Sequence, residues 1–214
     1  LDKYHRVWTT NDYGRLMRYD PAKDRLEVSP QALPHNPTFQ TGWHSVFYDA
    51  VLAPDGESIF ACTWIAQPRL MRIWLYEGNW GRVEDLGPAT QERDQTIPID
   101  TFKDHCGGLT VGGDGMIYYV ASRWRDAQYN PMGPEHTERE GVVWQLDPAN
   151  HNRREVSVLE RPGEFAQYVS RGAVDHNGDL FFGHVGPTPV GIFRVEMPAE
   201  RKRTNAHLPI RIWG

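Results

Sequence analysis

The chain has 214 residues, of which 39% are apolar and 24% are charged, so it is long enough to bury a substantial core in one domain. The net charge of −5 gives no basis for a nucleic-acid partner, and no apolar run approaches the roughly 20 residues of a membrane-spanning helix. Two cysteines make no disulfide framework, whereas 20 glycines and 16 prolines are typical of short strands joined by tight turns.

Two kinds of internal repeat run through the chain. TTNDYGRLMRY at 9–19 matches TWIAQPRLMRI at 63–73, an offset of 54 with RLMR identical. An apolar run, a turn ending in glycine and a second apolar run recur three times, at 51–64, 109–124 and 173–186. A third run follows each of them, and then a more polar fourth run; the third runs lie at 70–75, 141–148 and 191–198, and the fourth at 81–87, 153–160 and 209–214.

The pattern of each repeat unit therefore predicts four short antiparallel strands. The turn glycines Gly56, Gly115 and Gly178 follow Asp or Asn, a pairing that favours tight hairpins. Four-stranded units that recur in this order are typical of β-propeller blades, and a β-sandwich is the alternative. We expect an all-β fold, a single propeller domain over 1–214, with blades at about 1–41, 42–102, 103–165 and 166–214.

The first blade is expected to be incomplete. The offset of 54 places Asp2 opposite Gly56, so the chain would open at a hairpin without that blade's innermost strand. We therefore expect about four blades, forming the C-terminal part of a propeller of about six to eight blades, whose other blades lie in an upstream region. A complete four-bladed ring is the alternative.

The predicted rim of the central channel gathers most of the reactive side chains. In a propeller the innermost strands start at one rim, and the loops between second and third strands return to it. The entries are expected at 42–50, 103–108 and 166–172, and the loops at 63–69, 122–140 and 183–189. These segments supply His44, Tyr48, Asp49, Trp64, Asp104, His105, Cys106, Arg123, Trp124, His136, Tyr168, Arg171 and His184.

Several of these residues also have purely structural interpretations. His105 could bind a neighbouring backbone, Cys106 could be a small buried residue, and His184 remains open between the two kinds of role. Trp64 and Trp124 could pack between blades. Arg171 could pair with Asp49 or Asp175 instead of a ligand.

The rim residues suit carbohydrate chemistry on an acidic polymer. Aromatic faces stack on sugar rings, and arginine pairs with uronate carboxylates or sulfates. β-Elimination needs a neutralised carboxylate, a base and an acid. The candidates are His105 or His44 as the base, Tyr168 or Tyr48 as the acid, and Arg171 or Arg123 as the neutraliser. Tyr48, Trp64, Arg123 and Trp124 are the candidates for substrate binding.

Blade size, strand pattern and the His/Tyr/Arg-rich rim resemble those of the propeller-type polysaccharide lyases, the ulvan lyases and oligogalacturonate lyase. This resemblance implies a carbohydrate ligand and favours an extracellular or periplasmic location. A metal is a related possibility, since His105, Cys106 and His184 are of types that bind Zn²⁺; Ca²⁺ is the alternative cation.

Two further classes stay open. DHCGGLTVGGDGMIYY at 104–119 is similar to the DHxxGxLxxGxDxxIYY pattern of soluble quinoprotein sugar dehydrogenases, which implies His105 as a proton acceptor. The other class is a propeller that acts only as a binding platform or scaffold, because this fold hosts many unrelated functions.

Overall fold

The computed structural model describes residues 1–34, 46–63, 68–89, 106–123, 140–161, 164–165, 169–184 and 191–201. At 122–123, 140, 160–161 and 164–165 it describes the backbone alone. Within these ranges no helix is long and apolar enough to cross a membrane. Their one helical segment is a 3-10 turn, η1, at Ala199–Arg201.

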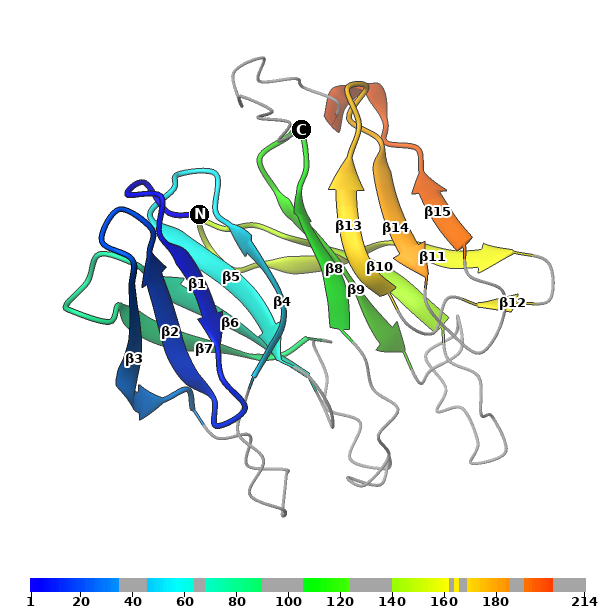
Figure 1. Cartoon of the computed structure of the whole chain (residues 1–214). Coiled ribbons are helices and arrows are strands. Elements are labelled where there is room, and N and C mark those ends of the chain that lie inside the picture. Colours follow the sequence, from blue (N-terminus) through cyan, green and yellow to red (C-terminus); the bar gives the residue numbers. More distant parts are fainter. Residues whose placement is uncertain are drawn as a thin grey trace, which may run out of the picture.

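The described strands form four antiparallel sheets that follow one another along the chain (Figure 1). The first sheet comprises β1 (Val7–Thr10), β2 (Arg15–Asp20) and β3 (Arg25–Ala32). The second comprises β4 (Phe47–Leu52), β5 (Ser58–Thr63), β6 (Arg69–Trp74) and β7 (Arg82–Pro88). The third comprises β8 (Cys106–Val111), β9 (Ile117–Arg123), β10 (Glu140–Leu146), β11 (Arg153–Arg161) and β12 (Glu164–Phe165). The fourth comprises β13 (Val169–Val174), β14 (Leu180–His184) and β15 (Gly191–Val195).

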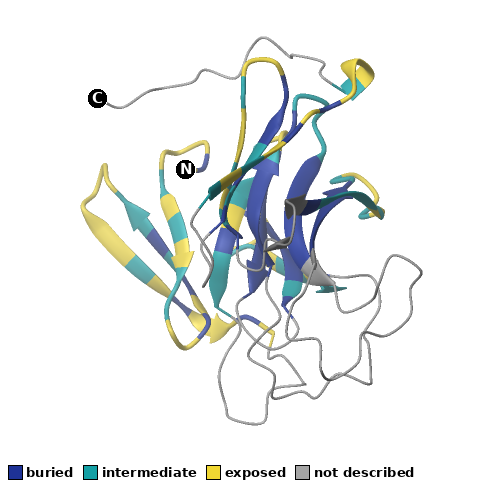
Figure 2. Cartoon of the chain, turned by 90° about the vertical axis from the view of Figure 1, so that its right-hand side faces the viewer, coloured by how far each residue is buried: buried dark blue, intermediate teal, exposed yellow. Residues whose placement is uncertain are grey.

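The sheets stack face to face, and β9 shows why. Successive side chains of a strand point to opposite faces. Tyr119 and Ala121 pack into one core with residues of the second sheet, whereas Tyr118 and Val120 pack into another with residues of the fourth. The third sheet is therefore apolar on both faces and lies between its two neighbours, and Figure 2 shows the buried residues concentrated in these inner layers.

The innermost strands lie side by side, with β4 against β8 and β8 against β13 (Figure 1). From this common line the second, third and fourth sheets extend outward strand by strand in chain order. Meandering sheets that radiate from adjacent innermost strands make a β-propeller-like fold. This confirms the predicted all-β, propeller-like architecture, while the number of blades, their boundaries and the position of this chain within a larger ring stay predictions.

One tight turn recurs in all four sheets, between the first and second strands of the repeat. In it a left-handed residue donates its backbone N–H to the carbonyl three residues earlier: Gly56 to Ala53, Gly115 to Gly112, Gly178 to Asp175 and His5 to Asp2. The sequence offset had set Asp2 opposite Gly56, but the structure sets His5 there, with φ of 60°. The strands that follow in the first sheet, β1 to β3, correspond to β5 to β7 of the second.

Candidate functional site

The starts of the innermost strands and the ends of the second strands lie at one edge of the sheets, where the rim was predicted. Phe47 pairs with Thr63 and Val169 pairs with His184, so innermost strands begin beside the ends of second strands. His184 in turn pairs with Gly191 at the start of β15. The described residues that flank 64–67, 124–139 and 185–190 therefore lie at the edge where β4, β8 and β13 begin.

Several predicted site residues lie outside the described residues. These are His44, Trp64, Asp104, His105, Trp124, His136 and Tyr168. Arg123 ends β9, and only its backbone is described. The roles predicted for these residues stay predictions. The structure does describe Tyr48, Asp49, Cys106, Arg171 and His184.

Each of the three described innermost strands contains a bulge near this edge. The pairing register shifts between Phe47 and Asp49 in β4, between Gly107 and Thr110 in β8, and between Val169 and Arg171 in β13. A bulge frees backbone groups from the ladder and redirects side chains, which is why bulges often occur beside functional sites.

Asp49, Gly108 and Arg171 occupy equivalent positions in the three bulged strands. Each stands at the same spacing before the turn glycine of its own sheet. The repeat thus places a carboxylate, a residue without a side chain and a guanidinium at matching points of three adjacent strands.

Asp49 links these strands by hydrogen bonds. Its Oδ2 accepts from the backbone N–H of Leu109, at 2.8 Å, which the bulge in β8 releases from the ladder. Its Oδ1 accepts from Nη1 of Arg171 at 2.6 Å and from the backbone N–H of Ala50 at 2.9 Å. One carboxylate therefore joins the second sheet to the third and the fourth.

Burial dominates the ionisation of Asp49. The residue is only 4% exposed, and desolvation raises the pKa of its carboxyl above the usual value. The hydrogen bonds from Leu109, Ala50 and Arg171 act in the opposite direction but do not cancel the effect of burial. The ionised carboxylate thus depends on these three donors.

Two glycines allow Asp49 and Arg171 to meet. Gly108 has a φ of 69°, and a Cβ on it would lie 2.8 Å from Cγ1 of Val169. A Cβ on Gly172 would collide with the carbonyl oxygen of Gly108. The backbones of β8 and β13 are therefore in close contact, and no side chain at position 108 separates the carboxylate from the guanidinium.

Arg171 remains accessible although it is paired. Its side chain is 78% exposed, and Asp49 is its only hydrogen-bonding partner within the described part of the chain. Of the two structural partners predicted for it, Asp49 is the one observed. Because Asp49 binds Nη1 alone, the remaining guanidinium N–H groups can bind an anion.

Cys106 lies in the core between the second and third sheets. Burial is the main cause that raises the pKa of its thiol well above the usual value, and the nearby Cys62 adds to this. The thiol of Cys62 donates to the carbonyl oxygen of Cys106 at 3.1 Å. This environment disfavours the thiolate that a metal would require.

His184 is buried at the end of β14, where its ring packs edge-to-face against Phe193 with centroids 6.0 Å apart. Within the described ranges no group of three or more His, Cys, Asp or Glu residues could hold a metal ion. The expected set of His105, Cys106 and His184 includes a residue outside those ranges, so it stays a prediction.

Tyr48 lies at the bulge of β4 and is half-buried. Burial raises the pKa of its phenol, with smaller contributions in the same direction from Cys62 and Asp49, while Arg171 lowers it. Tyr48 therefore keeps its proton at neutral pH, as a general acid must.

The sequence interpretation gave no role to Leu109 or Gly172. Their importance follows from the bulges and from the close approach of two backbones, which residue types alone do not reveal. The equivalence of Asp49 and Arg171 could have been found, since both stand at the same spacing before a turn glycine.

Comparisons with known proteins identify the fold. No family model and no curated protein matches the chain. A 6-phosphogluconolactonase-like structure from Bacteroides uniformis superposes with a TM-score of 0.53 and 14% identity, covering 89% of this chain and 47% of that one. The extracellular domain of a hybrid two-component system protein from Bacteroides thetaiotaomicron gives 0.52 and 18% identity, with 89% and 21% covered.

Oligogalacturonate lyase in complex with manganese gives a lower TM-score, 0.33, at 14% identity, with 85% of this chain and 56% of that chain covered. At these identities the first two structures share the fold alone. This chain spans about half the length of the first and about a fifth of the second. It therefore has a propeller-like fold that forms only part of the similar chains.

Proposed function

We propose that this chain belongs to a β-propeller that binds an acidic carbohydrate at the edge where β4, β8 and β13 begin. The observation that carries the proposal is Arg171, an exposed guanidinium on an innermost strand that the buried Asp49 holds in place. Such an arrangement presents a fixed positive group to the channel. A uronate carboxylate or a sulfate group is the matching ligand.

The enzymatic form of the proposal is β-elimination on a uronate-containing polymer. Arg171 neutralises the uronate carboxylate, which makes the adjacent C5 proton more acidic. His105 or His44 removes this proton, and Tyr48 or Tyr168 protonates the leaving oxygen. Tyr48 holds its proton at neutral pH, so a proton is available for this transfer. Arg123, Trp64 and Trp124 would contact neighbouring sugars.

Comparison with a solved structure supports both a sugar ligand and a larger ring. One similar structure is 6-phosphogluconolactonase-like, a name that refers to a sugar lactone. This chain covers 47% of that structure, so a ring of more than the four described sheets fits the comparison. We propose about six to eight sheets in the complete ring.

Calorimetric titration with uronate oligosaccharides tests the binding proposal. We expect binding that weakens about tenfold or more in Arg171→Ala, because a charge-assisted contact is lost. Arg82→Ala is the matched control, since Arg82 is also exposed and paired with a carboxylate but lies on the outer strand β7. Equal affinities for wild type and Arg171→Ala would overturn the proposal.

The lyase activity has its own readout. Incubation with a panel of uronate polymers should produce the ultraviolet absorbance of an unsaturated uronate, and Arg171→Ala should abolish it. Binding without this absorbance would favour a binding platform over an enzyme. A bound cofactor with its own visible absorbance would favour the quinoprotein class.

A further inference from the structure

In each sheet, an aromatic residue on the second strand of the repeat (β1, β5, β9 or β14) pairs with a residue on the third strand (β2, β6, β10 or β15). These four pairs occupy equivalent positions in the repeat. The cross-strand pairs are Trp8 with Arg18, Phe60 with Arg72, Tyr118 with Gln145, and Phe181 with Arg194. Three of the four sheets therefore present an arginine on the face that points toward the next sheet.

In the first two sheets this arginine binds the next sheet. Nη1 of Arg18 donates to the carbonyl of Asn79 at 3.0 Å, and Nη1 of Arg72 donates to the carbonyl of Pro148 at 2.7 Å. Both acceptors lie in the turn between the third and fourth strands of the following sheet. Both arginine side chains are almost fully covered there. We call this contact the arginine clasp.

Arg194 of the fourth sheet is held by hydrogen bonds in the orientation that the same contact requires. Its Nη2 donates to Oδ2 of the buried Asp179 at 2.7 Å, and its Nε lies 3.3 Å from the same oxygen. Asp179 stands where Ser58 accepts from Nε of Arg72 in the second sheet. Unlike Arg72, however, Arg194 has a side chain that is 50% exposed.

The apolar residues around Arg194 also correspond to residues around Arg72 in the second sheet. Phe181 corresponds to Phe60, and Ile192 corresponds to Leu70. Leu70 is fully buried against the third sheet, whereas Ile192 is 76% exposed. The outward face of the fourth sheet, defined by Phe181, Ile192 and Arg194, thus has the composition of a packing face. We call it the clasp face.

The first sheet exposes the complementary surface. The second sheet packs on the first through Ile59, Met71, Ile73 and Val83. The counterparts of these residues in the first sheet are Val7, Met17, Tyr19 and Leu26, which define its outward face, the receiving face. Val7 and Leu26 are exposed there.

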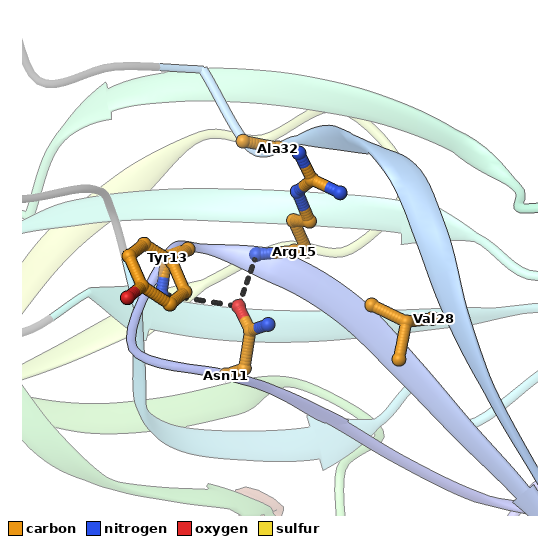
Figure 3. Close-up of a pocket in the computed structure, with 5 residues that line it drawn as sticks. All are labelled: Asn11, Tyr13, Arg15, Val28 and Ala32. Carbon is orange, nitrogen blue, oxygen red and sulfur yellow. Dashed lines mark hydrogen bonds between the residues drawn. The ribbon is translucent and has the colours of Figure 1, made fainter.

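The receiving face also contains a hollow. Its volume is about 410 Å³, and it is lined by Asn11, Tyr13, Arg15, Val28 and Ala32 (Figure 3). Oδ1 of Asn11 accepts hydrogen bonds from the backbone N–H groups of Tyr13 and Arg15 (Figure 3). These bonds hold the turn that forms one side of the hollow. Val28 belongs to the same face as Met17, its partner across β2 and β3.

The turn that would accept the clasp is present as well. Asp20-Pro21-Ala22 repeats Asp147-Pro148-Ala149, the turn that binds Arg72. In both turns the aspartate Oδ1 accepts from the alanine N–H two residues on, at 3.1 Å and 2.8 Å. The carbonyl of Pro21 thus stands where the carbonyl of Pro148 accepts from Arg72.

We propose that the clasp face of one copy of this chain packs on the receiving face of a second copy, with Arg194 donating to the carbonyl of Pro21. Both halves of the sheet-to-sheet interface are exposed on one chain, which is the condition for head-to-tail association. The proposal does not depend on carbohydrate binding.

Light scattering after size-exclusion chromatography, over a series of concentrations, tests this association. We expect wild type to form dimers or larger species, and Ile192→Glu and Leu26→Glu each to be monomeric. Tyr4→Glu is the control, because Tyr4 is exposed and its ring packs against Tyr76 of the second sheet, away from both faces. Circular dichroism would establish that each variant is folded.

Mixing the two variants distinguishes this contact from a symmetric one. Leu26→Glu keeps an intact clasp face and Ile192→Glu keeps an intact receiving face, so the mixture should form a one-to-one complex. A monomeric wild type at all concentrations would overturn the proposal and favour further sheets on the same polypeptide. Association that survives in both variants, or a mixture that stays monomeric, would overturn it too.

The clasp has a separate test. Arg194→Ala should raise the dissociation constant about tenfold, as expected for a lost charge-assisted hydrogen bond. Arg82→Ala, a substitution at an arginine of equal exposure, should leave the constant unchanged. An unchanged constant in Arg194→Ala would contradict the assigned contact.

Discussion

The carboxylate of Asp49 is buried and accepts three hydrogen bonds, so a substitution there removes acceptors as well as a charge. Asp49→Ala should lower the free energy of unfolding by about 2–4 kcal/mol, because the buried N–H of Leu109 loses its partner. Asp49→Asn keeps an oxygen acceptor and should cost less than half as much. Urea denaturation measures both, with the exposed Asp12→Asn as the control. Equal losses for the two substitutions would show that the charge alone matters.

His151 makes stability depend on pH. Burial lowers its pKa from the ordinary value of 6.5, Arg72 and Arg153 act in the same direction, and Glu84 and Asp147 oppose them. Nη1 of Arg72 lies 3.1 Å from Nε2, so the neutral ring accepts a hydrogen bond that the protonated ring cannot. The unfolded chain therefore binds the proton more readily than the folded chain does.

The sign follows from this difference. The stability that the neutral ring contributes is complete above about pH 6.5 and is lost as the pH falls from there to the lowered folded-state pKa. Thermal unfolding of His151→Asn should show a weaker decline over this window, and Asn tolerates the left-handed φ of 63° at this position. His176→Asn, in an exposed turn of the fourth sheet, is the control. Identical pH profiles for His151→Asn and wild type would refute this role.

At the scale of the strand, substitutions of Gly108 and Gly115 distinguish two roles of glycine, namely a positive φ and the close approach of neighbouring strands. Gly108→Ala should cost about 3 kcal/mol or more, because its Cβ would lie 2.8 Å from Val169 and 2.9 Å from Phe182 while φ stays positive. Gly115→Ala shares the positive φ but meets no atom within 4 Å, so it should cost only about 1 kcal/mol. Chemical denaturation of the pair isolates the close approach of β8 and β13. Similar losses at both sites would show that the two strands can separate.

The strands themselves were predictable because their signals are local. Gly56, Gly115 and Gly178 follow Asp or Asn, and they form the hairpin turns that this pairing favours. The equivalent turn at His5 was aligned wrongly, since a histidine in the left-handed region carries no comparable signal. The bulges that release the N–H of Leu109 depend on the packing of one sheet against another, and a single sequence does not encode them visibly.

At the scale of the molecule, each sheet packs mainly on its neighbours in the stack, so stability should vary along it. In hydrogen exchange of the monomeric Ile192→Glu variant, β5 and β9 should be protected longest, because they are buried between sheets. Strands β3 and β15 should exchange fastest, because most of their residues are exposed or only partly buried. Uniform protection across the four sheets would indicate a single cooperative unit.

The bond between Asp49 and Arg171 joins residues 122 positions apart in the chain. During synthesis from the N-terminus, Asp49 is therefore made long before β13. Its carboxylate stays hydrated until Arg171 has been synthesised and can bind it. The second and third sheets can pair early, but the bulged strands at their axis become fully satisfied only when the fourth sheet arrives. The residue pair that we propose to present a charge to a ligand would thus form late in folding, so that a nascent chain acquires this binding group only when the fourth sheet packs on the third.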